Sequence, residues 1–154
     1  MNRTSTLFLR ASFILMGLFV LALCIFALPE DWNTKGAEEF RPILLGMYIS
    51  AVPFFAALYQ GLKLLHYVDT NKAFSELSVK ALRNIKIHAF IIGGIYTIGL
   101  PYLYMIAQGA DAPGVLAIGL IIVGTSFSIS GFVGLLQKLL QNAIAIKSEN
   151  DLTV

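Results

Sequence analysis

Residues 112–137 read APGVLAIGLIIVGTSFSISGFVGLLQ, and none of these 26 residues is Asp, Glu, Lys or Arg. An α-helix rises about 1.5 Å per residue, so roughly 20 apolar residues cross the roughly 30 Å hydrocarbon core of a bilayer. The stretch is long enough and apolar enough to do so. It therefore predicts a membrane-spanning helix.

Three further stretches of the chain lack charged residues, at 11–28, 42–62 and 87–110. Only 13% of the 154 residues are charged and 57% are hydrophobic, whereas a soluble domain carries about 25% charged residues. Four buried helices in such a chain would leave too few polar residues for a soluble surface. We therefore predict one all-α integral membrane domain over 1–154. It is a four-helix bundle with spans at about 8–28, 42–62, 87–108 and 114–137, continued by cytoplasmic helical extensions.

The distribution of Lys and Arg predicts the orientation of these spans. Nine of the eleven basic residues lie in 1–10, 63–86 and 138–154, which an even number of spans places on one side of the membrane. The other side carries the remaining two, in 29–41. By the positive-inside rule both termini and the loop 63–86 are cytoplasmic.

The loop 63–86 contains a predicted amphipathic helix. Ser75 is placed to cap a helix that begins at Glu76, where an acidic residue favours the helix dipole. An apolar face recurs at helical spacing and basic residues lie elsewhere. The apolar face consists of Leu77, Ala81, Leu82 and Ile85. The loop either lies against anionic lipid headgroups or docks a cytoplasmic partner. The candidate docking residues are Lys72, Phe74, Ser75, Lys80, Arg83 and Lys86.

Apart from Arg10 at the cytoplasmic boundary of the first span, the spans carry no charged side chain. Proton relays, ion-coupled transporters and voltage sensors depend on such intramembrane charges. His66 and His88 lie at span boundaries without a second ligand at metal spacing, and no catalytic or phosphate-binding motif is present. We therefore predict a protein that is not an enzyme, holds no cofactor and binds no nucleic acid directly.

Small and hydroxyl residues recur inside the spans. Gly124 and Ser128 are four residues apart, as are Ser126 and Ser130, and this spacing lets helices approach closely and form hydrogen bonds. The polar residues serve helix packing, within the bundle or in a homo-oligomer, or they line a neutral pocket. The set comprises Tyr48, Ser50, Tyr96, Thr125, Ser126, Ser128 and Ser130.

Several segments resemble a bacterial family of small four-pass membrane proteins, domain of unknown function 2975, also called YoaS-like. They are LALCIF at 21–26, NKAFSELS at 71–78, DAPG at 111–114 and IKSENDLTV at 146–154. The resemblance covers nearly the whole chain and implies a four-pass topology in the bacterial cell membrane. It implies no activity. By association it suggests a cytoplasmic helix-turn-helix regulator as a partner, because members are encoded beside one.

Two functions from different classes follow. The favoured hypothesis is a non-enzymatic membrane component of a regulatory pair, whose cytoplasmic loop and C-terminal extension bind a DNA-binding regulator. In this hypothesis the bundle reports on the state of the membrane or on a ligand, through helices that Pro53 and Pro101 bend. The alternative is a small oligomeric transporter or pore for a neutral solute, built on the hydroxyl-rich fourth span.

Overall fold

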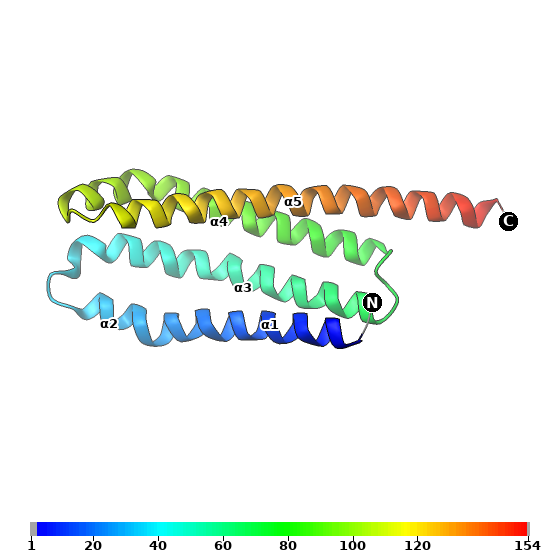
Figure 1. Cartoon of the computed structure of the whole chain (residues 1–154), viewed down its shortest axis with the longest axis horizontal. Helices are drawn as coiled ribbons and strands as arrows, with labels where there is room; N and C mark the ends of the chain where they lie inside the picture. The colour runs from blue at the N-terminus through cyan, green and yellow to red at the C-terminus, as the bar shows by residue number, and fades with distance from the viewer. Residues whose placement is uncertain (1–2, 154) are drawn as a thin grey trace.

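The computed structural model describes residues 3–153, and this part of the chain is helical with no strand. The elements are α1 (Arg3–Ala22), a π-helical segment η1 (Leu23–Ala27), α2 (Leu28–Asn33), a 3₁₀ turn η2 (Ala37–Phe40), α3 (Arg41–Asp69), α4 (Glu76–Gly109) and α5 (Pro113–Leu152) (Figure 1). They form four helical segments long and apolar enough to cross a membrane. The predicted all-α, four-span membrane architecture is confirmed.

The four long segments pack in the order of the sequence. α1 lies along α3, α3 along α4, and α4 along α5, which is the most extensive of the three contacts. α1 and α5 lie on opposite sides of the molecule (Figure 1), so no comparable contact closes the bundle within the described residues. Short connections explain this order, because consecutive helices joined by a few residues become antiparallel neighbours.

The two ends of the molecule differ in charge. The start of α1, the end of α5 and the α3–α4 loop, 70–75, lie at one end of the molecule (Figure 1); we call it the basic end. The loops 34–36 and 110–112 lie at the other, which we call the acidic end. A salt bridge of 2.8 Å between Arg10 and Asp69 joins α1 to the last turn of α3 at the basic end. Both side chains are partly exposed, so this pair contributes at most about 1 kcal/mol.

Helix α1 does not end at Pro29, where the sequence predicts the first loop, but continues as η1 and α2 to Asn33. The wider η1 turn accounts for this, because the Leu28 amide donates to the Leu23 carbonyl, five residues back. Pro29 has no amide hydrogen to donate. The Cys24 carbonyl therefore receives no hydrogen bond from either residue, and the Tyr48 hydroxyl of α3 donates to it at 3.0 Å.

Each pair of neighbouring long helical segments is joined by a hydrogen bond from a side-chain hydroxyl. Tyr48 joins α3 to η1, and the hydroxyls of Ser50 and Tyr96 lie 3.2 Å apart between α3 and α4. Ser130 of α5 donates to the Lys86 carbonyl of α4 at 3.0 Å. Hydrogen bonds of this kind between membrane helices are worth roughly 0.6–2 kcal/mol.

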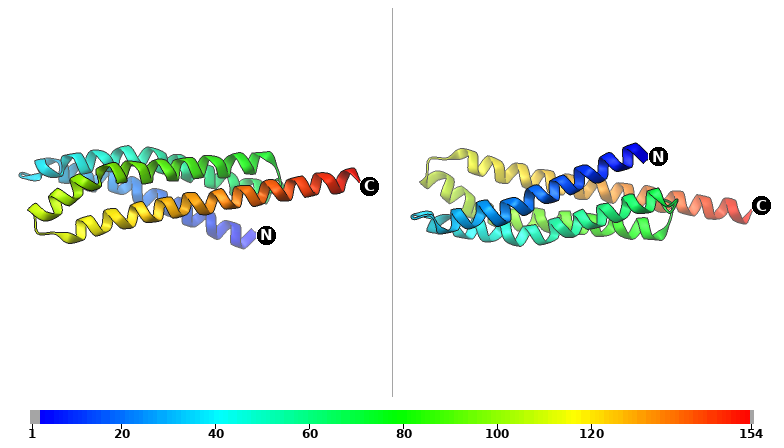
Figure 2. Two further views of the ribbon diagram at one scale, coloured as in Figure 1. Left: turned by 90° about the horizontal axis from the view of Figure 1, so that it is seen from above. Right: turned by 90° about the horizontal axis from the view of Figure 1, so that it is seen from below.

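Close packing at the interfaces depends on glycines that face large side chains. A Cβ built on Gly17 would lie 2.6 Å from the Leu58 side chain, between α1 and α3. A Cβ on Gly93 of α4 would lie 2.9 Å from the ring of Phe127 on α5. The sequence predicts Pro53 and Pro101 inside helices, and they lie inside α3 and α4. The last turns of α4 lean away from its first part (Figure 2), as an internal proline produces.

The contact between Tyr48 and Cys24 gives a first prediction. Tyr48→Phe removes the only side-chain donor that the structure shows for the Cys24 carbonyl, so we expect it to lower the free energy of unfolding by about 1–2 kcal/mol. The measurement is an equilibrium unfolding titration from mild detergent into sodium dodecyl sulfate. Tyr59→Phe on the same helix is the control, because Tyr59 is 58% exposed. Equal losses in the two variants would contradict the assignment.

The adjacent glycines Gly93 and Gly94 give a second prediction. Gly93→Ala forces a methyl group against the Phe127 ring, whereas nothing lies within 4 Å of a Cβ on Gly94. Overpacking of this kind costs about 1–3 kcal/mol, and alanine is the better helix former. We expect Gly93→Ala to destabilise the protein and Gly94→Ala to leave it unchanged or more stable in the same titration. The reverse order would show that α4 and α5 do not pack in this register.

Candidate functional site

The α3–α4 loop at the basic end is a defined turn. Two residues after the last residue of α3, Asn71 adopts the left-handed backbone conformation, at φ 60°. The Lys72 amide donates to the Tyr67 carbonyl at 2.7 Å and the Asn71 amide to the Val68 carbonyl at 3.4 Å. This is the Schellman arrangement, and it returns the chain into α4 within a few residues.

The start of α4 lies at Glu76 as predicted, with Ser75 in extended conformation before it. The predicted side-chain cap is wrong, because Ser75 makes no capping hydrogen bond. Its hydroxyl donates instead to the Lys72 carbonyl, as does that of Ser78, which is fully buried. Two hydroxyls therefore hold the backbone of Lys72, and the contact of Ser75 is structural.

The apolar face of early α4 packs inside the protein. Ser78, Val79, Ala81 and Leu82 are buried, whereas Leu77 is 47% exposed. The buried face is therefore rotated from the predicted one and excludes Leu77. The chain's own helices, and not lipid headgroups, cover this side of the predicted amphipathic helix.

The opposite side of early α4 remains exposed. We call the exposed residues Lys72, Phe74, Lys80 and Arg83 the basic-end surface. Phe74 is 59% exposed. Lys86 does not belong with them, contrary to the prediction, because its half-buried side chain lies against Gly134 of α5 and its carbonyl accepts from Ser130.

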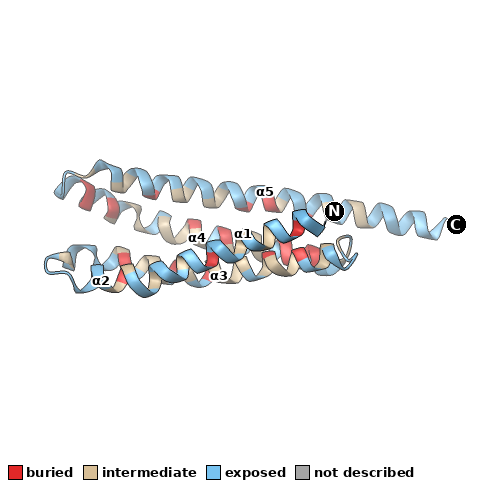
Figure 3. Cartoon of the chain, turned by 60° about the horizontal axis from the view of Figure 1, so that its bottom comes forward, coloured by how far each residue is buried: buried red, intermediate tan, exposed pale blue. Residues whose placement is uncertain are grey.

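Helix α5 passes the first turns of α4 and continues alone beyond the basic end (Figures 1 and 3). We call residues 138–152 the α5 extension. Most of its residues are exposed, among them Leu139 (55%) and Ile146 (63%). The sequence predicted a helical extension here, which is confirmed, but these two side chains were not among the predicted site residues. The sequence could have predicted them, because the helical spacing of apolar residues in α5 continues past Gln137.

The predicted hydroxyl set divides into two groups. Tyr48, Ser50, Tyr96 and Ser130 make the inter-helix contacts described above, which favours helix packing for them. The other three lie on α5 and make no hydrogen bond within the described residues; Thr125 and Ser128 are exposed and Ser126 is half-buried. The seven residues do not line one pocket.

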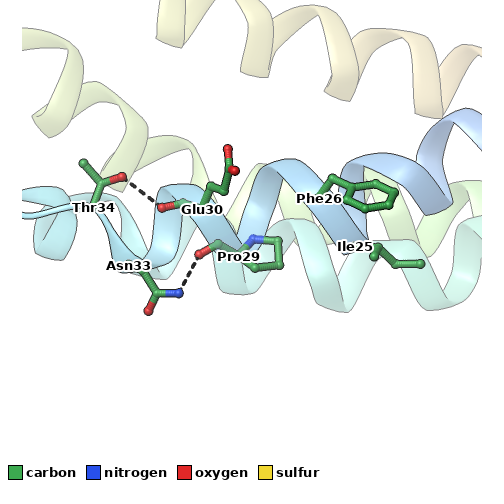
Figure 4. A pocket seen from close by; sticks show the side chains of 6 residues that line it. All are labelled: Ile25, Phe26, Pro29, Glu30, Asn33 and Thr34. Carbon is green, nitrogen blue, oxygen red and sulfur yellow. Dashed lines mark hydrogen bonds between the residues drawn. The ribbon is translucent and has the colours of Figure 1, made fainter.

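A shallow hollow of about 610 Å³ lies along η1 and α2 near the acidic end (Figure 4). The Asn33 side chain donates to the Pro29 carbonyl and Thr34 to that of Glu30. The Asn33 and Thr34 side chains of the lining are thus hydrogen-bonded to nearby backbone carbonyls, which leaves the Glu30 carboxylate. The described residues contain no group of three or more metal-ligating side chains. The arrangement offers exposed surfaces for contact with other molecules.

Comparison with known proteins agrees with this architecture. Residues 5–154 match the model of the family described as "Protein of unknown function (DUF2975)". The chain belongs to this family. It is 50% identical over 161 residues to the uncharacterized membrane protein YoaS of Bacillus subtilis (strain 168), with both chains covered completely. No solved structure matches.

The family assignment confirms the resemblance and identifies the chain as a membrane protein of uncharacterised function. Neither the family nor the relative names an activity or a partner. The family thus supports the topology, and the function has to be argued from the basic-end surface and α5.

The loop at the basic end gives a third prediction. Asn71→Gly keeps the positive φ without strain, whereas Asn71→Val places a β-branched residue at φ 60°, which costs about 1–2 kcal/mol. We expect the valine variant to unfold at lower denaturant concentration and the glycine variant to match the wild type. A tolerated valine would mean that the chain does not turn at this residue.

Proposed function

We propose that this protein is the non-enzymatic membrane component of a regulatory pair and holds a cytoplasmic DNA-binding regulator at the bacterial cell membrane. The observation that carries the proposal is the basic-end surface. One side of early α4 is buried in the protein, and the other presents Lys80 and Arg83 to solvent, while the Phe74 ring is exposed on the loop before it.

This surface suits a protein partner by its chemistry. Aromatic residues and Arg are enriched in protein interfaces, and this surface exposes Phe74 and Arg83. The first turns of α4 are held by the turn at Asn71 and by the buried Ser78, so a partner would bind a rigid element at little entropic cost. A complementary partner carries acidic side chains around an apolar pocket for Phe74.

The orientation supports a cytoplasmic partner. The basic end carries nine of the eleven Lys and Arg of the chain, and the positive-inside rule places such an end in the cytoplasm. A DNA-binding regulator is the partner class that the family resemblance suggests. The membrane protein would sequester that regulator and compete with DNA for it.

Transport of a neutral solute is the alternative. The observation in its favour is the three hydroxyls of Thr125, Ser126 and Ser128, which have no partner in the described residues. Because the row of helices is open, a channel would need several copies. Solute flux in liposomes that disappears when the three residues become alanine would favour this alternative.

The fourth prediction tests the regulatory pair by affinity purification of the tagged full-length protein from native membranes in mild detergent. We expect a stoichiometric DNA-binding protein, and about tenfold less of it with the double variant Lys80→Glu/Arg83→Glu, which corresponds to about 1.4 kcal/mol. Phe74→Ala should lower it similarly. The matched control is Lys35→Glu, an exposed lysine at the acidic end, which should retain the wild-type amount.

Two results would overturn the regulatory proposal. One is recovery of the protein without any cytoplasmic DNA-binding protein. The other is a co-purified regulator whose amount is the same in wild type, Lys80→Glu/Arg83→Glu and Lys35→Glu, because the basic-end surface would then play no part in binding it.

A further inference from the structure

Helix α5 has two opposite faces with different surroundings. One face packs on α4 and includes the buried residues Gly119, Ser130, Val133 and Gln137. The other face looks away from the rest of the chain over the whole length of the helix. Its residues follow a spacing of four, three and four, and we call them the outer stripe: Ala117, Ile121, Gly124, Ser128, Phe132, Leu135, Leu139, Ala143, Ile146 and Asn150.

The outer stripe is straight and uncovered. A repeat of eleven residues corresponds to about 3.67 residues per turn, so the stripe stays on one side of a nearly straight helix for about 50 Å. Every member is exposed except Ala143, which is half-buried. Phe132 is 62% exposed and Leu135 is 54% exposed. No atom lies within 4 Å of a Cβ built on Gly124.

Neither lipid nor water is a favourable environment for the whole of the outer stripe. In the span, lipid cannot hydrogen-bond to the Ser128 hydroxyl, which has no partner within the described residues, and an unpaired polar group in hydrocarbon is costly. Beyond the span, water meets Leu139 and Ile146 on a helix that stands alone (Figure 1). An isolated helix of about 15 residues is only marginally stable in water.

Whatever covers the outer stripe must therefore extend from the hydrocarbon region into water, as the stripe does. We propose that it is the α5 helix of a second copy of this chain, packed in parallel through a two-fold axis. A second α5 has the required length, the same orientation in the membrane and an identical stripe. Gly124 and Ser128 let the two backbones approach within the span and allow hydrogen bonds across the contact.

The charges beside the stripe favour a parallel copy over other partners. At about 100° per residue, Lys147 and Glu149 lie on opposite flanks of the stripe. In a parallel two-fold pair, one flank of each helix faces the other flank of its partner. Each Lys147 would then lie beside the Glu149 of the second copy, and the α5 extension is self-complementary in charge as well as in apolar surface.

The pair leaves the basic-end surface free, because that surface lies on the α3–α4 loop and early α4 and not on α5. A dimer would present this surface twice with two-fold symmetry, but the α5 contact does not depend on a regulator. The test therefore uses the protein alone, and its outcome is separate from that of the affinity purification.

The fifth prediction is a cysteine cross-linking experiment. Cys24 is the single cysteine of the chain, so Cys24→Ser provides a cysteine-free background that keeps the backbone carbonyl to which Tyr48 donates. Single cysteines at Ser128, Leu139 and Ile146 should give disulfide-linked dimers in native membranes under mild oxidation, because facing Cα atoms would lie within about 7 Å.

Two exposed positions off the stripe are the matched controls. Ser148 lies on the α5 extension about 160° from the centre of the stripe, and Ile98 is 83% exposed on α4. We expect at least tenfold more dimer from the stripe cysteines than from Ser148→Cys or Ile98→Cys. Equal yields at all five positions, absence of dimer at all of them, or linkage of the stripe to a different protein would overturn the proposal.

A second measurement does not depend on oxidation. Gly124→Leu fills space that is empty within the chain, so the fold should tolerate it, but it blocks the approach of two α5 helices. We expect it to lower the dimer fraction about tenfold in liposomes, measured by fluorescence transfer between labelled copies. Gly94→Leu, at another open glycine, should leave the dimer intact. Equal transfer in both variants would exclude the α5 contact.

Discussion

The structure depends on the requirement that backbone amides and carbonyls be hydrogen-bonded within the protein, because hydrocarbon offers them no partner. Helices meet that requirement everywhere except where proline removes a donor. Near Pro29, η1 moves the Leu28 amide onto Leu23, and the carbonyl of Cys24 is left for the Tyr48 hydroxyl. A backbone carbonyl that lacks a donor within its own helix thus forms a contact between two helices.

A second constraint explains why each pair of neighbouring helices carries a polar contact. Lipid tails are as apolar as the side chains that face them, so no hydrophobic force draws spans together. Close approach at Gly17 and Gly93 and the contacts of Ser50 with Tyr96 and of Ser130 with Lys86 supply the association instead. These contacts link neighbours along the row, and within residues 3–153 no other helix covers the far sides of the two outer helices.

The open row makes the two proposals compatible. The basic-end surface, on the α3–α4 loop and early α4, is basic and partly aromatic, which suits a protein partner at one end of the molecule. The outer stripe of α5 extends through both solvents, which suits only another helix of the same kind. One surface would decide what the protein binds, and the other would decide how many copies present it.

The sequence alone determined the membrane-spanning class, the number of spans and the approximate limits of each. The reason is that the length of a stretch without charged residues can be read from consecutive residues. It also determined the helical start at Glu76 and the continuation of α5, since apolar periodicity is local. Only the tertiary structure decided which side of each helix is covered. It turned Leu77 outward, directed the Ser75 hydroxyl to Lys72 and drew Lys86 against α5. It also divided the hydroxyl residues between inter-helix contacts and an uncovered face. The physical reason is that periodicity defines a face, whereas the neighbour that buries it depends on how distant segments pack.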